Sequence, residues 1–196
     1  MNESTATLWS VVIGALLATV GGFAATQMEG ILRRRERERS AALLFGEILT
    51  ALELVTRIAN ESRGRGDPYG PFTMRLLRAV RRETDTYDRN REQLYDLRDP
   101  TTRAQIHGLM VRVTLALEGV SDAAEQIGFL DGAAAGLAED DPMRRELAAQ
   151  RAVEAESRAS AFDFMVAGAS QIKPIIEALA PLSKQSFERH EAVMRG

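Results

Sequence analysis

The chain has 196 residues, of which 45% are hydrophobic and 27% are charged, and its net charge is -3. These values are typical of a globular protein, and the weakly acidic balance argues against the broad basic surface of a nucleic-acid-binding protein. Because the chain has no cysteine, disulfide bonds, a cysteine nucleophile and thiolate metal sites are excluded.

Residues 8–28, "LWSVVIGALLATVGGFAATQM", contain no charged side chain. About 20 residues of helix cover the hydrocarbon core of a bilayer, so this segment predicts one transmembrane helix after a short extracytoplasmic N-terminus, residues 1–7. A cleaved signal peptide and a buried helix of a soluble protein are the alternatives. The signal peptide is disfavoured because residues 1–7 lack Lys and Arg and contain Glu3.

Five arginines follow the apolar segment within a juxtamembrane helix predicted over residues 29–40: Arg33, Arg34, Arg35, Arg37 and Arg39. The positive-inside rule then places the N-terminus outside and the rest of the chain in the cytoplasm. Lysine occurs only at Lys173 and Lys184, and this preference for arginine is typical of a GC-rich bacterial genome, so the expected location is a bacterial inner membrane. The same arginines could also recognise anionic lipid headgroups. Glu36 and Glu38 weaken that second interpretation, since they lower the local charge.

Small residues recur at every fourth position of the apolar segment, at Gly14, Ala18, Gly22 and Thr26. Such spacing forms a groove along one side of a helix, where a second helix can approach closely in lipid. The sequence therefore predicts a transmembrane packing face and a homo-oligomer.

A cytoplasmic helical bundle is predicted over residues 41–181. Its first helix continues from the membrane without a break, because an apolar heptad stripe begins directly after the arginines. The stripe consists of Ala41, Phe45, Ile48, Leu52, Val55 and Ala59. A loop is predicted at residues 63–71, where Gly, Asp and Pro cluster. Its "RGD" tripeptide is interpreted as a coincidence.

The second helix, predicted from Pro71 to about Leu97, has a more polar stripe. The heptad positions include Thr84, Tyr87 and Arg91. These three residues are interpreted either as the rim of the bundle or as a face that binds a partner through an aromatic ring and a cation.

Asp-Pro pairs at residues 99–100 and 141–142 each predict a helix N-cap followed by a proline in the first turn. The third helix has an apolar stripe from Ile106 to Ile127, and the stretch after it is predicted to be a connection. The fourth has a stripe from Ala155 to Leu179, with a kink expected near Pro174. Residues 182–196 are predicted to be a polar helical tail. No stretch alternates like a strand, so the expected fold is all-α, an antiparallel bundle of about four helices.

The segment "YDRNREQLYDLRDPTTRAQIHGLMVRVTLALEGV", residues 87–120, resembles the middle of uncharacterised bacterial single-pass membrane proteins. These proteins have an Arg-rich juxtamembrane turn and a cytoplasmic helical bundle. The resemblance implies this architecture and no activity.

No motif predicts a catalytic, cofactor-binding or metal-binding residue. The two histidines, His107 and His190, are far apart in sequence, and the paired motifs of a di-iron bundle are missing. We therefore expect a protein that is not an enzyme and takes no cofactor, nucleic acid or small-molecule substrate.

The predicted function is a membrane-anchored interaction, scaffold or accessory subunit with an unidentified protein partner. The alternative is a regulatory module that passes a change from the membrane span to the bundle.

Overall fold

The computed structural model describes residues 3–184 and 187, and all their side chains except those of residues 3–13, 15, 24 and 25. The described chain is all-α, as expected, and no strand occurs in it. The helices are α1 (Glu3–Arg63), α2 (Pro71–Asn90), the 3-10 helix η1 (Arg91–Asp96), α3 (Pro100–Ala134), α4 (Pro142–Ala169) and α5 (Ile172–Ser183).

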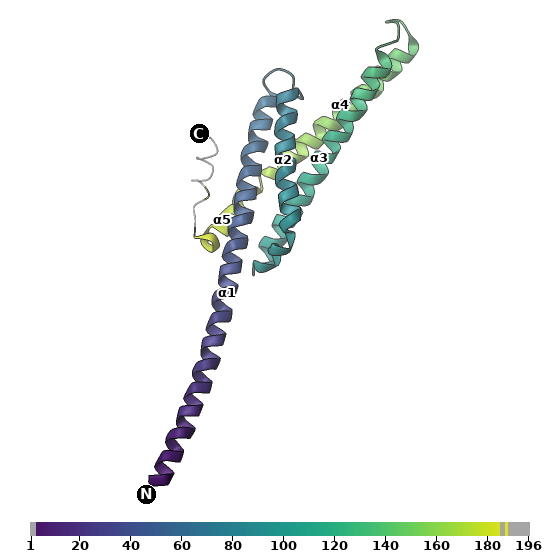
Figure 1. Cartoon of the computed structure of the whole chain (residues 1–196). Helices are drawn as coiled ribbons and strands as arrows, with labels where there is room; N and C mark the ends of the chain where they lie inside the picture. The colour runs from purple at the N-terminus through teal and green to yellow at the C-terminus, as the bar shows by residue number, and fades with distance from the viewer. Residues whose placement is uncertain (1–2, 185–186, 188–196) are drawn as a thin grey trace.

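Helix α1 is one unbroken helix of 61 residues, so the expected continuity through the arginines is confirmed. Its C-terminal half packs in the bundle, whereas its N-terminal half stands clear of every other helix (Figure 1). Within the described residues, no helix has both the length and the apolar character needed to cross a membrane. The predicted span, residues 8–28, lies partly outside the side chains that the structure describes.

The core of the bundle forms where α1, α2, α5 and the adjoining parts of α3 and α4 meet. The first predicted heptad stripe is confirmed, because Ala41, Phe45, Ile48, Leu52 and Ala59 are all buried and Val55 is partly buried. Opposing helices contribute Val80, Ile106, Phe162 and Leu179, and each of these is fully buried. Burial of these apolar faces provides the main favourable free energy of folding.

Two Asp-Pro pairs begin helices as predicted. The Asp99 carboxylate accepts hydrogen bonds from the backbone N–H groups of Thr101 and Thr102, at 3.1 and 2.9 Å. The Asp141 carboxylate accepts one from the Met143 N–H at 2.8 Å. These bonds satisfy N–H groups that have no partner within the helix.

Replacing Asp99 by Ala is expected to lower the melting temperature in a pH-dependent way. Its hydrogen bonds from Thr102 and Thr101 hold the pKa of the carboxyl group below its ordinary value of 3.8. A lowered pKa in the folded state means that the stabilisation is complete above pH 3.8 and is lost as the pH falls through the folded-state pKa. Thermal melts of the wild type and Asp99→Ala should therefore differ at pH 7, and the difference should shrink as the pH falls below 3.8. A difference that persists unchanged at low pH would contradict this account.

The expected kink near Pro174 is a complete break between α4 and α5. The proline has no N–H to bond the carbonyl of Ser170, and its ring collides with that carbonyl in a continuous helix. The chain therefore leaves the helix after Ala169 and restarts at Ile172, which places Pro174 in the first turn of α5. A proline is tolerated there because first-turn N–H groups lack helical partners.

Helix α3 extends to Ala134, beyond the connection that the sequence predicts from about residue 128. It forms a hairpin with α4, and the tip of this hairpin projects past the rest of the bundle (Figure 1). The two backbones approach closely: a Cβ on Gly119 would lie 3.2 Å from that of Ala161. A glycine on α3 that faces an alanine on α4 thus brings the two helices close together, and Ala123, Ile127 and Leu130 of α3 are buried further along.

Candidate functional site

The arginine segment of α1 lies at the end of the bundle from which the free half of α1 emerges (Figure 1). The side chains of Arg33, Arg34, Arg35, Arg37 and Arg39 are all exposed. Arg33 pairs with Glu29 one turn earlier, at 2.5 Å. The segment is therefore a solvated stretch of helix whose cations do not all have an acidic partner within the helix.

Glu38 is the buried exception in this segment, with 8% of its surface exposed. Its carboxylate accepts a hydrogen bond from the Arg98 backbone N–H and pairs with the Arg98 guanidinium, both at 3.2 Å. This paired contact ties α1 to the connection between η1 and α3. The charge of Glu38 is thus compensated by Arg98 and does not cancel the neighbouring arginines of α1.

A cavity of about 480 Å³ separates the arginine segment from the end of α5. Both helices contribute charged and apolar residues to its lining, which comprises Leu32, Arg35, Glu36, Glu38, Arg39, Pro181, Leu182 and Lys184. Arg39 holds the two helices together, since its Nε donates a hydrogen bond to the Ser183 carbonyl at 3.2 Å. The structure therefore joins two of the five predicted arginines, Arg35 and Arg39, to residues almost 150 positions later, which sequence reasoning did not connect.

The predicted partner face at Thr84, Tyr87 and Arg91 is corrected by the burial of two of its members. Thr84 is 3% exposed and Tyr87 is 2% exposed, so only Arg91 is at the surface. Both hydroxyls have a partner at the edge of the bundle: Thr84 donates to the Arg81 carbonyl at 2.8 Å, and the Tyr87 hydroxyl lies 2.9 Å from Nδ1 of the exposed His107. Buried polar groups are tolerated when they are hydrogen-bonded, which is why these positions belong to the core. Burial also raises the pKa of Tyr87.

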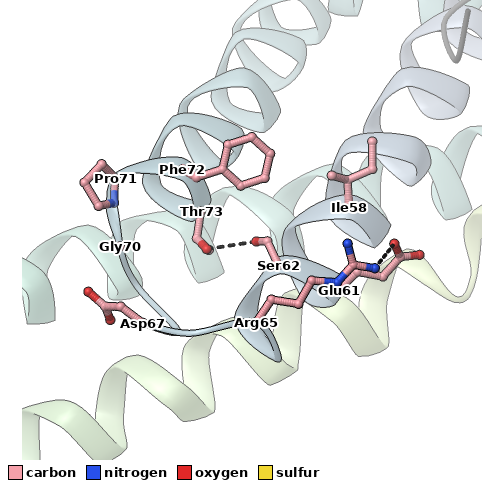
Figure 2. Close-up of a pocket in the computed structure, with 9 residues that line it drawn as sticks. All are labelled: Ile58, Glu61, Ser62, Arg65, Asp67, Gly70, Pro71, Phe72 and Thr73. Carbon is pink, nitrogen blue, oxygen red and sulfur yellow. Dashed lines mark hydrogen bonds and ion pairs between the residues drawn. The ribbon is translucent and has the colours of Figure 1, made fainter.

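A second cavity, of about 390 Å³, opens where the loop between α1 and α2 leaves the bundle (Figure 2). Ser62 and Thr73 close one wall of the cavity with a hydrogen bond of 2.8 Å, and the Phe72 ring lies beside Thr73 (Figure 2). The "RGD" stretch forms part of this loop, where Asp67 accepts a hydrogen bond from the Tyr69 N–H at 3.1 Å. The carboxylate thus shapes the turn.

Cations and aromatic rings gather beside this loop in a cluster that sequence reasoning missed. The Arg158 guanidinium lies 3.9 Å from the centre of the Tyr69 ring, and that of Arg63 lies 4.9 Å from the centre of the Phe162 ring. Arg63 also forms an ion pair with Asp163. Because these residues come from α1, the loop and α4, no local sequence pattern signals the cluster. Such contacts stabilise a fold by about 0.5–2 kcal/mol each.

Replacing Tyr69 by Leu is expected to destabilise the protein by about 2 kcal/mol, since the ring holds its cation at close range. Tyr69→Phe should be neutral or stabilising, because the buried hydroxyl has no hydrogen-bond partner among the described residues. Chemical denaturation of the three proteins measures both effects. Equal losses in the two variants would show that the hydroxyl, and not the ring, carries the stabilisation.

The predicted transmembrane packing residues Gly14, Ala18, Gly22 and Thr26 are all exposed on the free half of α1. Apart from the neighbouring residues and the local backbone of α1, no described atom lies within 4 Å of a Cβ built on either glycine. The Thr26 hydroxyl donates to the Gly22 carbonyl at 2.9 Å, so it is satisfied within the helix.

In the part of the chain that the structure describes, no group of three or more His, Asp or Glu side chains could hold a metal ion. His190 lies outside the described residues, as does most of the predicted tail, residues 182–196. Comparison of the chain with protein-family models, with curated proteins and with solved structures finds no match.

Proposed function

We propose that the protein is a single-pass membrane-anchored helical-bundle protein that acts as an interaction, scaffold or accessory subunit. The N-terminal half of α1 is the anchor, the N-terminus lies outside, and the bundle lies in the cytoplasm. The bundle carries no catalytic role in this proposal.

One observation carries the proposal: the free half of α1 exposes large apolar side chains to its surroundings. Leu16, Leu17, Val20, Phe23 and Met28 are each 59–68% exposed. A contiguous apolar surface of this kind is rare on a soluble monomer and is typical of a surface that meets lipid or another chain. The exposed arginines that follow support the orientation, since cytoplasmic ends of membrane helices carry the excess of positive charge.

Membrane fractionation of bacteria that express the full chain tests the anchor. The protein should stay with the membrane after carbonate washing, and a C-terminal alkaline-phosphatase fusion should be inactive. Release by carbonate would overturn the anchor, and an active fusion would overturn the orientation.

Self-association through the small-residue face is the second element of the proposal. At 100° per residue, Gly14, Ala18, Gly22 and Thr26 lie on the opposite side of α1 from Leu16, Val20 and Phe23. Another helix could therefore pack on the small side while the large side chains face lipid.

Gly14→Leu combined with Gly22→Leu is expected to abolish the homodimer signal in a bacterial two-hybrid assay of the full chain. The added side chains fill the groove that a second backbone would occupy. Val20→Leu combined with Gln27→Leu adds bulk on the opposite side and should preserve the signal. Equal loss in both pairs, or no signal in the parent, would remove this face as an interface.

A regulatory module is the alternative function, and the unbroken course of α1 favours it, because a rigid helix can pass a movement from the membrane to the bundle. A pull-down from gently solubilised membranes separates the two functions. A regulatory module should capture a kinase, a transcription factor or another effector, whereas a scaffold should capture the subunits of an assembly.

A further inference from the structure

We propose that the cavity between α1 and α5 binds the phosphate-bearing headgroup of an anionic phospholipid. Arg35 and Lys184 are the headgroup cations, and Leu32 and Leu182 cover the first part of the acyl chains. The inference rests on the proposed membrane anchor, which would place this end of the bundle at the bilayer surface.

The charge of the cavity matches an anion. Three cations line it, Arg35, Arg39 and Lys184, against the carboxylates of Glu36 and Glu38. The Glu38 carboxylate is already paired with Arg98, so it does not compete for the lining cations. The Arg39 side chain donates one N–H to the Ser183 carbonyl, and its guanidinium group keeps its positive charge. An excess of positive charge therefore faces the cavity, and it is the property that attracts anionic lipid.

Apolar lining residues from both helices distinguish a lipid site from a plain anion site. Leu32 is 55% exposed on α1, and Pro181 and Leu182 approach from α5. On the free half of α1, the exposed apolar surface continues toward the N-terminus through Ile31 and Met28. A headgroup held by the cations would thus have its acyl chains directed along a surface that is already apolar.

The backbone at Lys184 gives a separate reason to assign its side chain a role. Lys184 ends α5 in the left-handed conformation, with φ 56° and ψ 28°. It is the only described residue other than glycine that has a positive φ. Glycine adopts this conformation without steric cost and is the usual residue at such helix ends. The backbone therefore does not favour lysine here, whereas a cavity that needs a cation at this point does.

Calorimetric titration of the full chain in a non-ionic detergent tests the site. The probes are dioctanoylphosphatidylglycerol, dioctanoylphosphatidylcholine and inorganic phosphate. We expect the phosphatidylglycerol to bind, and the other two to bind at least tenfold more weakly. Arg35→Gln and Lys184→Gln should each weaken binding about fivefold. That factor corresponds to the binding free energy that one cation contributes near an anionic headgroup.

Two matched variants separate a defined site from diffuse attraction. Arg37→Gln removes a charge from the same segment of α1, and Lys173→Gln removes the other lysine, at the far end of α5; neither residue lines the cavity. Both should leave binding unchanged. Lys184→Gly should weaken binding as Lys184→Gln does while keeping or raising the melting temperature, so the loss cannot come from unfolding.

Equal weakening in all four charge variants would overturn the site, as would equal binding of the two lipids or no binding at all. Inorganic phosphate that binds as tightly as phosphatidylglycerol would overturn the lipid assignment. Because the short-chain lipid is delivered in detergent, these results do not depend on membrane insertion. A protein that resists carbonate extraction but does not distinguish the lipids keeps the proposed anchor and loses the site. One that is extracted but prefers phosphatidylglycerol loses the anchor and keeps the site.

Discussion

Leu117→Asp is expected to destabilise the bundle by about 4 kcal/mol or more, which is a large part of the stability of a domain of this size. Leu117 lies on α3 and is 4% exposed, at a position of the predicted heptad stripe. An aspartate there either buries an unpaired carboxylate or takes up a proton, and in both cases it loses the packing of the leucine. Thermal unfolding of the full chain in mild detergent, followed by circular dichroism, measures the effect.

Leu115→Asp is the matched control, because it makes the same chemical change two residues earlier on the same helix. Leu115 is 58% exposed, so its substitution should change the free energy of unfolding by less than about 1 kcal/mol. Similar losses in the two variants would show that the face of α3 that packs in the bundle is wrongly assigned.

Gly46→Ala is expected to destabilise the wild-type protein and to stabilise a variant that lacks the Phe187 ring. A Cβ on Gly46 would overlap that ring, which is 4% exposed and packs directly on the backbone of α1. The ring must then leave its site, and the loss of its burial costs about 2–3 kcal/mol. The gain in helix propensity from Gly to Ala is only about 1 kcal/mol, so the net effect in the wild type is destabilising.

Phe187→Ala alone should cost about 3 kcal/mol, and Gly46→Ala added to it should restore about 1 kcal/mol. Chemical denaturation of the four proteins completes this double-mutant cycle, whose coupling energy measures the contact. A coupling energy near zero would mean that Phe187 does not pack against Gly46.

Sequence periodicity predicted the all-α class, because apolar residues at heptad spacing have few ways to be buried. It did not predict every helix end: the second helix was expected to reach about Leu97, but α2 ends at Asn90 and the 3-10 helix η1 follows it. The two Asp-Pro pairs also located the starts of α3 and α4, since a carboxylate N-cap followed by proline acts within one turn of helix. The end of α3 was misjudged. Glycines at 128, 132 and 136 suggested a connection, but contacts with α4 keep the helix intact as far as Ala134.

The candidate site could be predicted only in part. The arginines of α1 form a local pattern, whereas Lys184 and Leu182 reach the same cavity through the path of α4 and α5, which periodicity does not determine. The polar residues Thr84 and Tyr87 misled the prediction for a related reason. Both side chains are buried because Arg81 and His107 provide hydrogen-bond partners for their hydroxyls, and the Tyr87 partner comes from another helix.

The unbroken course of α1 fixes the rotational phase between its free half and the bundle. Each residue added between the two halves would turn the bundle by about 100° around the helix axis and shift it by about 1.5 Å along that axis. A deletion or insertion near residue 30 therefore redirects every surface of the bundle, the α3–α4 hairpin included, while it leaves the folding of each half unchanged. In a pair of chains joined along α1, the angular position of residue 30 would decide which faces of the two bundles point toward each other.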